Sequence, residues 1–356
     1  MSEKVLMKGN EAIAEAAITA GCRHYFGYPI TPQTEIAAYM AKRMPKIGGT
    51  FLQAESEIAA INMVYGAASA GKRVMTSSSS PGISLKSEGI SYLAGSDLPA
   101  VIVNAQRGGP GLGGIQPSQS DYFQATRGGG HGDYHILVLA PASVQEMAAL
   151  TVKAFDLADK WRMPAMILAD GTIGQVMEPV TFDFDIAPAP EKPWATTGTE
   201  LRRPHNIVNS LCLQPEELER QNFARFDRYA QVEKEEPLCE EYLTEDADVV
   251  VAAFGIAARV SKNAVDEARR QGIKAGLIRP ITLWPFPKAN FAKLVGKTKA
   301  IITVELSMGQ MVEDVLLATK CRIPVEKCNR AGGMIPSSER VLREIVEASQ
   351  GGEIPW

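Results

Sequence analysis

Three groups of polar residues have types and spacings that could carry chemistry, and the first is G-Y-P-I-T-P-Q-T-E at residues 27–35. Pro29 and Pro32 disfavour a helical conformation in the residues before them, so the segment should be extended. It should place Thr31 at the N-cap of a helix over residues 32–44. The free N–H groups and dipole of a helix N-terminus favour anions. The segment predicts either a well-capped structural helix or a hydroxyl and helix end that contact a carboxylate substrate.

The second group is the pair of acids in A-E-S-E-I at residues 54–58, directly after a strand-like stretch at 50–54. Two acids in a first helical turn commonly just complement the helix dipole. An acid at the mouth of a parallel sheet, however, lies where such sheets bind ligands. Partial burial would favour its protonated form and let it hold or share a proton. Glu55 and Glu57 are candidates for either role.

The third group is a glycine-rich stretch over residues 106–121 that continues over 127–133. Nine glycines between residues 108 and 132 predict a long loop, and loops of this length are commonly functional or disordered. The glycines at 109, 111 and 114 fit the G-x-G-x-x-G pattern of dinucleotide-binding proteins. Because Pro117 and a polar stretch follow, no helix should open at the third glycine, and a dinucleotide site is the weaker interpretation.

Two side chains beside this loop could contact a ligand. Arg107 stands at the exit of a predicted strand, where a guanidinium can hold a carboxylate with two hydrogen bonds. The alternative for Arg107 is a structural ion pair. His131 lies within the loop and could contact substrate or cofactor, although a lone histidine is more often structural.

The elements that must position these residues alternate between strand and helix over residues 1–185. Apolar periodicity predicts a helix at 10–20, capped by Asn10 and ended by Gly21, and a helix at 55–70 that ends at Gly71. A long amphipathic helix is predicted at 143–161, and strands at 50–54, 73–77, 100–105, 135–140 and 165–169. This alternation predicts a mostly parallel α/β sheet.

The rest of the chain divides in two. Residues 186–245 are rich in Pro, Glu and Arg, and predict a connector with a helix at 215–236. The connector is either a surface linker or an arm that packs on a partner subunit. Residues 246–356 predict a second α/β unit, with strands at 248–255, 274–280, 300–306 and 324–330 and a helix at 259–271.

Composition restricts the partners of the chain. Its 356 residues carry a net charge of −4, which gives no electrostatic case for nucleic acid or an anionic membrane surface. No apolar run reaches the ~18 residues that span a bilayer, and the N-terminus does not read as a signal peptide, so a cytoplasmic protein is expected. The five cysteines are scattered, and no two form C-x-x-C, which argues against a disulfide framework, a zinc site or an iron–sulfur cluster in this chain.

The three groups together resemble the alpha subunit of 2-oxoacid:ferredoxin oxidoreductases. Y-P-I-T-P at 28–32 is similar to that family's signature near the start of the pyrimidine domain, and S-E-I-A-A-I-N-M-V-Y-G-A at 56–67 is similar to its glutamate helix. The arginine before a glycine-rich loop matches as well. The resemblance covers essentially the whole chain. It implies an α/β thiamine-diphosphate-binding fold (the pyrimidine domain) followed by a transketolase C-terminal-like α/β domain.

The resemblance assigns roles to individual residues. Glu57 matches the glutamate that binds N1′ of the thiamine diphosphate pyrimidine, and it is preferred to Glu55 because S-E directly precedes the small-residue helix. Thr31 matches a threonine that contacts substrate, and Ile30 and Thr31 are expected beside the cofactor. Arg107 matches the arginine that binds the 2-oxoacid, and His131 is expected near the substrate.

The implied reaction is an oxidative decarboxylation that needs partner chains. Thiamine diphosphate attacks the 2-oxoacid, carbon dioxide leaves, electrons pass through iron–sulfur clusters to ferredoxin, and coenzyme A takes the acyl group. The sequence has no G-D-G followed by an asparagine to hold Mg²⁺ and the diphosphate. The resemblance places that motif and at least one cluster on a beta subunit, with gamma and ferredoxin-like delta subunits also expected.

The glycine-rich run looks most like the branched-chain (3-methyl-2-oxobutanoate) subgroup, with the 2-oxoglutarate subgroup as the alternative. A second carboxylate would need a second basic group, which Arg127 or His131 could supply. A dinucleotide-binding protein and a non-catalytic scaffold with the same fold remain the competing hypotheses.

Overall fold

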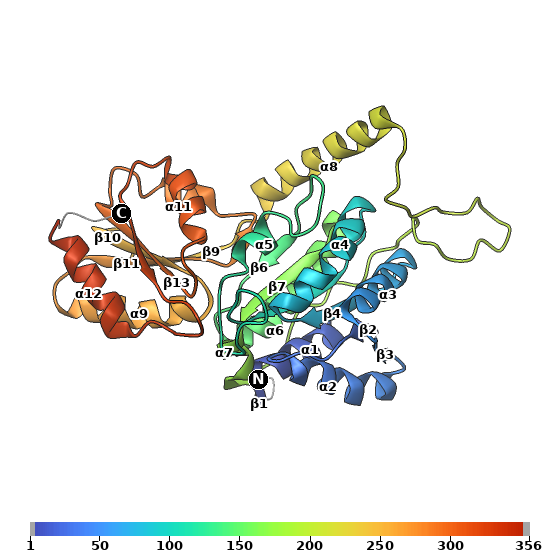
Figure 1. The fold of residues 1–356 in the computed structure, drawn as a ribbon, viewed down its shortest axis with the longest axis horizontal. Helices are drawn as coiled ribbons and strands as arrows, with labels where there is room; N and C mark the ends of the chain where they lie inside the picture. The colour runs from blue at the N-terminus through green and yellow to red at the C-terminus, as the bar shows by residue number, and fades with distance from the viewer. Residues whose placement is uncertain (1–3, 352–356) are drawn as a thin grey trace.

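The computed structural model describes residues 4–351, which form two α/β units that lie side by side (Figure 1). The first unit is built on a seven-stranded sheet with the order β12-β6-β7-β5-β4-β2-β3. Its parallel strands are β2 (His24–Gly27), β3 (Thr50–Gln53), β4 (Val74–Ser78), β5 (Val101–Gln106), β6 (Leu137–Leu139) and β7 (Ala165–Asp170). The predicted parallel sheet is confirmed.

Helices cover this sheet in packed pairs. Helix α1 (Gly9–Thr19) packs on α6 (Val144–Trp161), and α3 (Glu57–Ser69) packs on α4 (Ser80–Gly95). The edge of the unit carries α2 (Thr34–Arg43), the 3-10 helix η1 (Met44–Ile47), α5 (Tyr122–Thr126), α7 (Gly171–Gln175) and the antiparallel pair β1 (Val5–Lys8) and β8 (Met177–Val180). Since β4, β5 and β7 are wholly buried, the sheet centre is a rigid platform for the loops at its edge.

The second unit is a five-stranded sheet with the order β14-β13-β10-β11-β9. Its strands are β9 (Cys239–Tyr242), β10 (Val249–Ala253), β11 (Ala275–Pro280), β13 (Ala300–Glu305) and β14 (Val325–Asn329), of which β9 is antiparallel. Its helices are α9 (Gly255–Arg270), α10 (Lys288–Ala292), α11 (Met311–Thr319) and α12 (Ser338–Ser349). The antiparallel edge strand β9 comes from the segment predicted as a connector.

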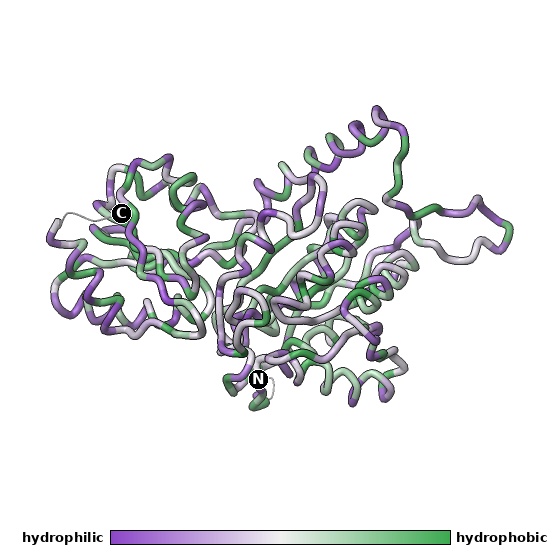
Figure 2. The backbone as a smooth tube through the Cα atoms, viewed as in Figure 1, coloured by the Kyte–Doolittle hydropathy of each residue, from purple (hydrophilic) through white to green (hydrophobic). Residues whose placement is uncertain are grey.

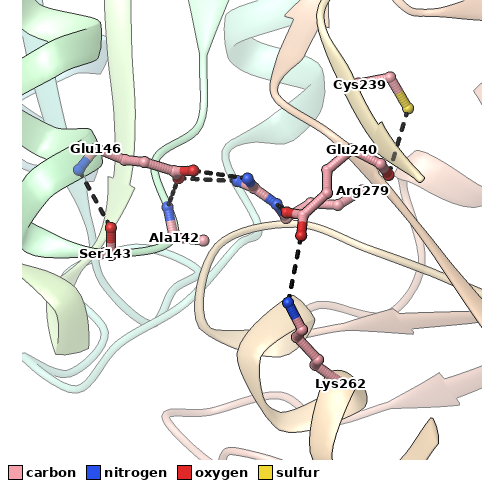
Figure 3. A network of polar contacts seen from close by, with 7 residues as sticks. All are labelled: Ala142, Ser143, Glu146, Cys239, Glu240, Lys262 and Arg279. Carbon is pink, nitrogen blue, oxygen red and sulfur yellow. Dashed lines mark hydrogen bonds and ion pairs between the residues drawn. The ribbon is translucent and has the colours of Figure 1, made fainter. Parts of the chain in front are cut away.

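The two units are joined by a shared strand and by an ion pair between a buried arginine of the second unit and an acid of the first. Strand β12 (Thr282–Trp284) leaves the second unit and pairs antiparallel with β6 of the first. Arg279, which is 5% exposed, contacts Glu146 of α6 and Glu240 of β9, both at 2.7 Å (Figure 3). These contacts fix how loops from the two units face each other.

Residues 181–214 contain no helix or strand. Phe182, Phe184, Ile186 and Trp194 pack against the core of the first unit, and the segment then projects from the unit before α8 (Pro215–Glu235) (Figure 1). Green apolar stretches alternate with purple polar ones along this segment and α8, whereas the strands inside both units are mostly green (Figure 2). Its exposed apolar side chains include Leu201, Ile207, Leu211, Leu213 and Phe223. The base of α8 is anchored where Tyr229 packs against His135 and Trp284.

Two predicted helix starts are wrong. Helix α1 begins at Gly9, so Asn10 lies inside the first turn, where its side chain instead donates to the Pro32 carbonyl. Helix α2 begins at Thr34 with Gln33 at the N-cap, because residues 30–33 form a turn in which the Gln33 N–H bonds to the Ile30 carbonyl. Thr31 therefore belongs to a turn and is not the N-cap.

Candidate functional site

Arg107 and Thr31 come together at the edge of the first sheet where the parallel strands end. Arg107 directly follows β5 and is 7% exposed. Its Nη1 donates to the Thr31 carbonyl at 3.0 Å and its Nη2 to the Leu112 carbonyl at 3.2 Å. Its buried Nε has no hydrogen-bond partner within residues 4–351. An oriented guanidinium with an unsatisfied donor is suited to receive a carboxylate or carbonyl oxygen.

Polar side chains, among them the buried Gln33 and Asn10, hold the turn that carries Thr31. The Gln33 amide donates to the Tyr28 carbonyl and accepts from the Ser77 hydroxyl at the end of β4. Asn10 and Gln175 both donate to the Pro32 carbonyl from outside the turn. Thr31 itself is exposed and Ile30 is half-buried, so both side chains remain accessible to a ligand.

Glu57 is the first residue of α3. Ser56 is the N-cap of this helix, and its hydroxyl accepts a hydrogen bond from the Ala59 N–H. The Glu57 side chain is 6% exposed, whereas Glu55 is exposed. No residue in the described range donates a hydrogen bond to the Glu57 carboxylate. A buried carboxylate without a protein partner is suited to engage a ligand N–H, because an unpaired buried charge is unfavourable.

The close approach of α4 shapes the space around this carboxylate. A Cβ built on Gly82 would lie 2.8 Å from Glu57 Oε1 and 2.1 Å from Ser78 Oγ. Only glycine therefore lets the first turn of α4 come so near to Glu57. The buried hydroxyls of Ser78 and Ser79 have no partner within residues 4–351. The unpaired Ser78 hydroxyl lies near Glu57, because both flank the position that a Cβ on Gly82 would take.

A cavity of about 630 Å³ opens between the two units on the other side of the α4 first turn. The first unit contributes Ser80, Pro81, Ser84, residues 107–111, Ser118, Ser120 and Asp121, and the second contributes residues 306–308, Gln310, Ala331 and Gly332. Arg107 is thus shared between the cavity and the Thr31 turn. Glu57 and Thr31 do not line the cavity, although Glu57 contacts the same helical turn.

Asp121 gives the cavity a carboxyl group that can hold a proton. It accepts from the Ser80 hydroxyl at 2.6 Å and from the Asn104 amide at 2.9 Å. Burial raises the pKa of Asp121 above its ordinary value, and the two hydrogen bonds oppose that rise. Sequence reasoning missed this group, because Ser80 and Asp121 are 41 residues apart. The run T-S-S-S-S-P-G at the end of β4 was the available signal.

The glycine-rich segment behaves as a loop. Residues 108–121 contain no helix, and Gly113, at φ +56°, would place a Cβ only 1.9 Å from the Gly108 carbonyl oxygen. The helix that a dinucleotide fingerprint requires is therefore missing from this segment. His131 is exposed and does not line the cavity, so the structure does not group it with Arg107 and Thr31. Its contact with substrate stays a prediction.

Within residues 4–351, no group of three or more His, Cys, Asp and Glu side chains is arranged to hold a metal ion. No helix in the same range is long and apolar enough to cross a membrane.

The sequence matches two family descriptions over most of its length. Residues 15–209 match the thiamine-diphosphate-binding domain of pyruvate flavodoxin/ferredoxin oxidoreductase, and residues 247–341 match core domain II of pyruvate:ferredoxin oxidoreductase. The ketoisovalerate oxidoreductase subunit VorB of Methanothermobacter marburgensis is 52% identical over 96% of this chain and 97% of that protein. The 2-oxoglutarate synthase subunit KorA of Methanothermobacter thermautotrophicus is 36% identical over 98% of this chain and 100% of that protein.

Solved structures agree with the sequence matches. The 2-oxoglutarate:ferredoxin oxidoreductase from Magnetococcus marinus, with 2-oxoglutarate, coenzyme A and succinyl-CoA bound, superposes with a TM-score of 0.86 at 29% identity. The match covers 98% of this chain and 66% of that one, so this chain spans slightly less than two thirds of its length. A split-gene transketolase shares the fold alone, at a TM-score of 0.61 and 16% identity. The expected thiamine-diphosphate-type fold is confirmed, and the chain belongs to the 2-oxoacid:ferredoxin oxidoreductase family, whose members work as subunits of larger enzymes.

Proposed function

We propose that this chain is the alpha subunit of a ferredoxin-dependent oxidoreductase that converts 3-methyl-2-oxobutanoate and coenzyme A to acyl-CoA, carbon dioxide and reduced ferredoxin. The observation that carries the proposal is the buried Glu57 carboxylate, which has no hydrogen-bond donor within residues 4–351 and faces Gly82, a glycine that leaves room around it. The family match to a thiamine-diphosphate-binding domain supports the same ligand.

Glu57 would hold the pyrimidine of thiamine diphosphate by sharing a proton with N1′. When bound, the cofactor supplies a nucleophilic carbon that takes up the electrons left by decarboxylation. A hydrogen bond is stronger where water is excluded, so the burial of Glu57 favours a shared proton between its carboxyl group and N1′. Ile30 and Thr31 would lie beside the cofactor, on the turn that Gln33 holds in place.

Arg107 would bind the carboxylate or carbonyl of the 2-oxoacid, with Thr31 as a second contact. Its two Nη donors are already engaged by backbone carbonyls, so the guanidinium is oriented before substrate arrives. Orientation of this kind lowers the entropic barrier of the reaction. Burial raises the pKa of Asp121 above its ordinary value, so its carboxyl group holds a proton more readily and repels a bound anion less than an ordinary aspartate would.

The charge and polarity of the cavity favour a branched-chain substrate over 2-oxoglutarate. Leu306, Met308 and Pro81 give the wall apolar surface, and Arg107 is the one cation among its lining residues. Arg127, the candidate for a second carboxylate, instead pairs with Asp314 at 3.2 Å. His131, the other candidate, does not line the cavity, so a distal carboxylate would meet no second cation among the described residues that line it, which is unfavourable for a desolvated charge. The 52% identity to a ketoisovalerate oxidoreductase subunit points the same way.

The proposal requires partner chains. A beta subunit would supply the Mg²⁺ and diphosphate site and at least one iron–sulfur cluster, with gamma and ferredoxin-like delta subunits completing the route to ferredoxin. The later part of segment 181–214, from Leu201 on, and α8 expose apolar side chains, which supports the interpretation of this region as an arm that packs on a partner. A cytoplasmic location stays a prediction.

The test is to purify the chain with its co-expressed partner subunits and to compare substrates. Viologen reduction should require thiamine diphosphate and coenzyme A, and kcat/KM should be highest for 3-methyl-2-oxobutanoate, above 2-oxoglutarate and pyruvate. A higher kcat/KM for 2-oxoglutarate would overturn the substrate assignment and leave the family intact. A complex that binds NAD and shows no 2-oxoacid-dependent reduction would overturn the whole proposal.

A further inference from the structure

Gln119 reaches from the glycine-rich segment of the first unit into the second unit. Its side chain is fully buried and does not line the cavity, whereas Ser118, Ser120 and Asp121 on either side of it do. A glutamine amide carries donors and an acceptor, and such groups are hydrogen-bonded in most cases when they are buried. The partners of Gln119 therefore show what holds this part of the cavity wall.

Both ends of the Gln119 amide bond to the second unit. Its Oε1 accepts from the Leu306 N–H at 3.1 Å, and its Nε2 donates to the Phe254 carbonyl at 2.9 Å. The Gln119 backbone N–H also donates to the Leu306 carbonyl at 2.9 Å. One residue of the first unit thus engages both backbone groups of Leu306.

The two partners of Gln119 lie at the ends of neighbouring strands. Phe254 directly follows β10 and Leu306 directly follows β13, and these strands pair in parallel. Gly255 makes room for the glutamine, because a Cβ on this residue would lie 2.9 Å from Gln119 Nε2. The Gln119 amide therefore bridges the two strand ends in a space that a larger residue at position 255 would narrow.

Leu306 is the part of the cavity wall that Gln119 holds. It lines the cavity from the second unit, and Arg107 lines it from the first. The loop between β5 and α5 carries Arg107 at its start and Gln119 near its end. The position of an apolar wall residue relative to the guanidinium thus depends on hydrogen bonds between the units.

We propose that Gln119 is a positioning residue that fixes Leu306 relative to Arg107 and thereby sets the preference for a branched-chain 2-oxoacid. The proposal rests on the proposed function, in which Arg107 binds the carboxylate or carbonyl of the substrate. With that end of the substrate held, the branched carbons meet the apolar wall at a defined distance. A gap of about 0.5–1 Å forfeits a quarter to a half of a dispersion contact, so a displaced wall binds these carbons less well.

The test compares Gln119→Met with Tyr122→Phe in the complex purified with its partner subunits. The Met side chain has a similar length and bonds to neither strand end. The complex should still assemble, because the Gln310 side chain continues to bond to two backbone groups of the same loop. Tyr122→Phe is the matched control, since it removes a buried hydrogen bond of 2.6 Å to Asp314 of the second unit, and Tyr122 does not line the cavity. If Gln119→Met does not assemble, Gln119→Asn, whose amide is one methylene shorter, takes its place.

The readout is kcat and KM for 3-methyl-2-oxobutanoate and for pyruvate, whose single methyl group uses less of an apolar wall. In Gln119→Met the KM for 3-methyl-2-oxobutanoate should rise about tenfold, because one methylene in an apolar pocket contributes about 10- to 200-fold to discrimination. Its kcat and both constants for pyruvate should change little, as expected for a loss of uniform binding. Leu306→Ala should give the same pattern, whereas Tyr122→Phe should keep the wild-type ratio of kcat/KM between the two substrates.

The outcomes separate this inference from the proposed function. Wild-type selectivity in an assembled Gln119→Met or Gln119→Asn complex would overturn the role of Gln119 and leave the proposed substrate in place. An equal loss of selectivity in Tyr122→Phe would overturn it as well, because a general loosening of the joint between the units would then be responsible. A wild-type complex without preference for 3-methyl-2-oxobutanoate over pyruvate would overturn both the proposed substrate and the role of Gln119.

Discussion

Replacement of Gly82 by alanine should displace the Glu57 carboxylate and weaken cofactor binding. The new Cβ would lie 2.1 Å from Ser78 Oγ and 2.8 Å from Glu57 Oε1, both closer than the 3.0 Å limit that real Cβ atoms respect. The Ser78 hydroxyl at the end of β4 and the Glu57 carboxylate must therefore both move to make room for the new Cβ. A shift of about 1 Å in a positioned group can reduce activity about a hundredfold.

Two opposing effects determine the stability of Gly82→Ala. Overpacking of a well-filled site costs about 1–3 kcal/mol, and alanine gains about 1 kcal/mol over glycine in a helix. Gly82→Ala should therefore lower the free energy of unfolding by up to about 2 kcal/mol. Gly66→Ala is the matched control, because a Cβ on this glycine of α3 meets nothing within 4 Å. It should be neutral or stabilise by up to about 1 kcal/mol.

The assay for both variants is denaturant unfolding of the co-purified complex, together with calorimetric titration of thiamine diphosphate. Gly82→Ala should raise the Kd and lower kcat, while Gly66→Ala should leave both unchanged. If Gly82→Ala bound the cofactor and unfolded like the wild type, the close contact between α4 and Glu57 would not matter for the site, and the reasoning would be refuted.

Three further predictions concern Arg107, which we expect to bind the substrate, Arg279 between the two units, and the buried Asp170. Arg107→Lys loses the planar guanidinium that two backbone carbonyls orient. The kcat/KM for the 2-oxoacid should therefore fall at least tenfold, while the Kd of thiamine diphosphate changes little. Equal losses in substrate and cofactor binding would contradict a substrate role for Arg107. Arg279→Met leaves Glu146 and Glu240, each about one third exposed, without their buried partner. It should lower the free energy of unfolding, measured in denaturant, by about 1–3 kcal/mol. An unchanged unfolding midpoint would show that these ion pairs do not contribute to stability. Burial raises the pKa of Asp170 from 3.8 to about 6, so the folded protein binds this proton more tightly than the unfolded chain does. The melting temperature should therefore fall as the pH rises from about 4 to about 6. Asp170→Asn should remove that fall, and a fall of the same size in the variant would contradict the assignment.

Local pattern predicted the main elements of the fold. The alternation of apolar strands with amphipathic helices led to the parallel sheet, and α3, α6 and α9 lie close to where their periodicity put them. Helix α4 was missed because Pro81, Gly82 and Gly89 read as turn residues in isolation. Tertiary packing explains them: Gly82 and Gly89 let α4 lie against α3, and proline suits a first helical turn.

In the site as well, local sequence patterns predicted some residues, and others depend on tertiary packing. Short motifs drew attention to Glu57, Thr31 and Arg107, and the structure places Arg107 directly on the Thr31 turn. The contact between Ser80 and Asp121 and the hydrogen bonds of the Gln119 amide depend on how distant segments pack, which no window of sequence contains. Strand β12 illustrates the limit most clearly, because a segment of the second unit completes the sheet of the first.

The most direct test of the central claim is Glu57→Ala in the complex purified with its partner subunits. In this variant, viologen reduction with 3-methyl-2-oxobutanoate and coenzyme A should be lost and the Kd of thiamine diphosphate should rise, while the complex still assembles and retains its iron–sulfur absorbance. Glu55→Ala, two residues away and exposed, should retain activity. Turnover by Glu57→Ala at the wild-type rate, with the same cofactor affinity, would contradict the assignment of Glu57 as the residue that holds the cofactor.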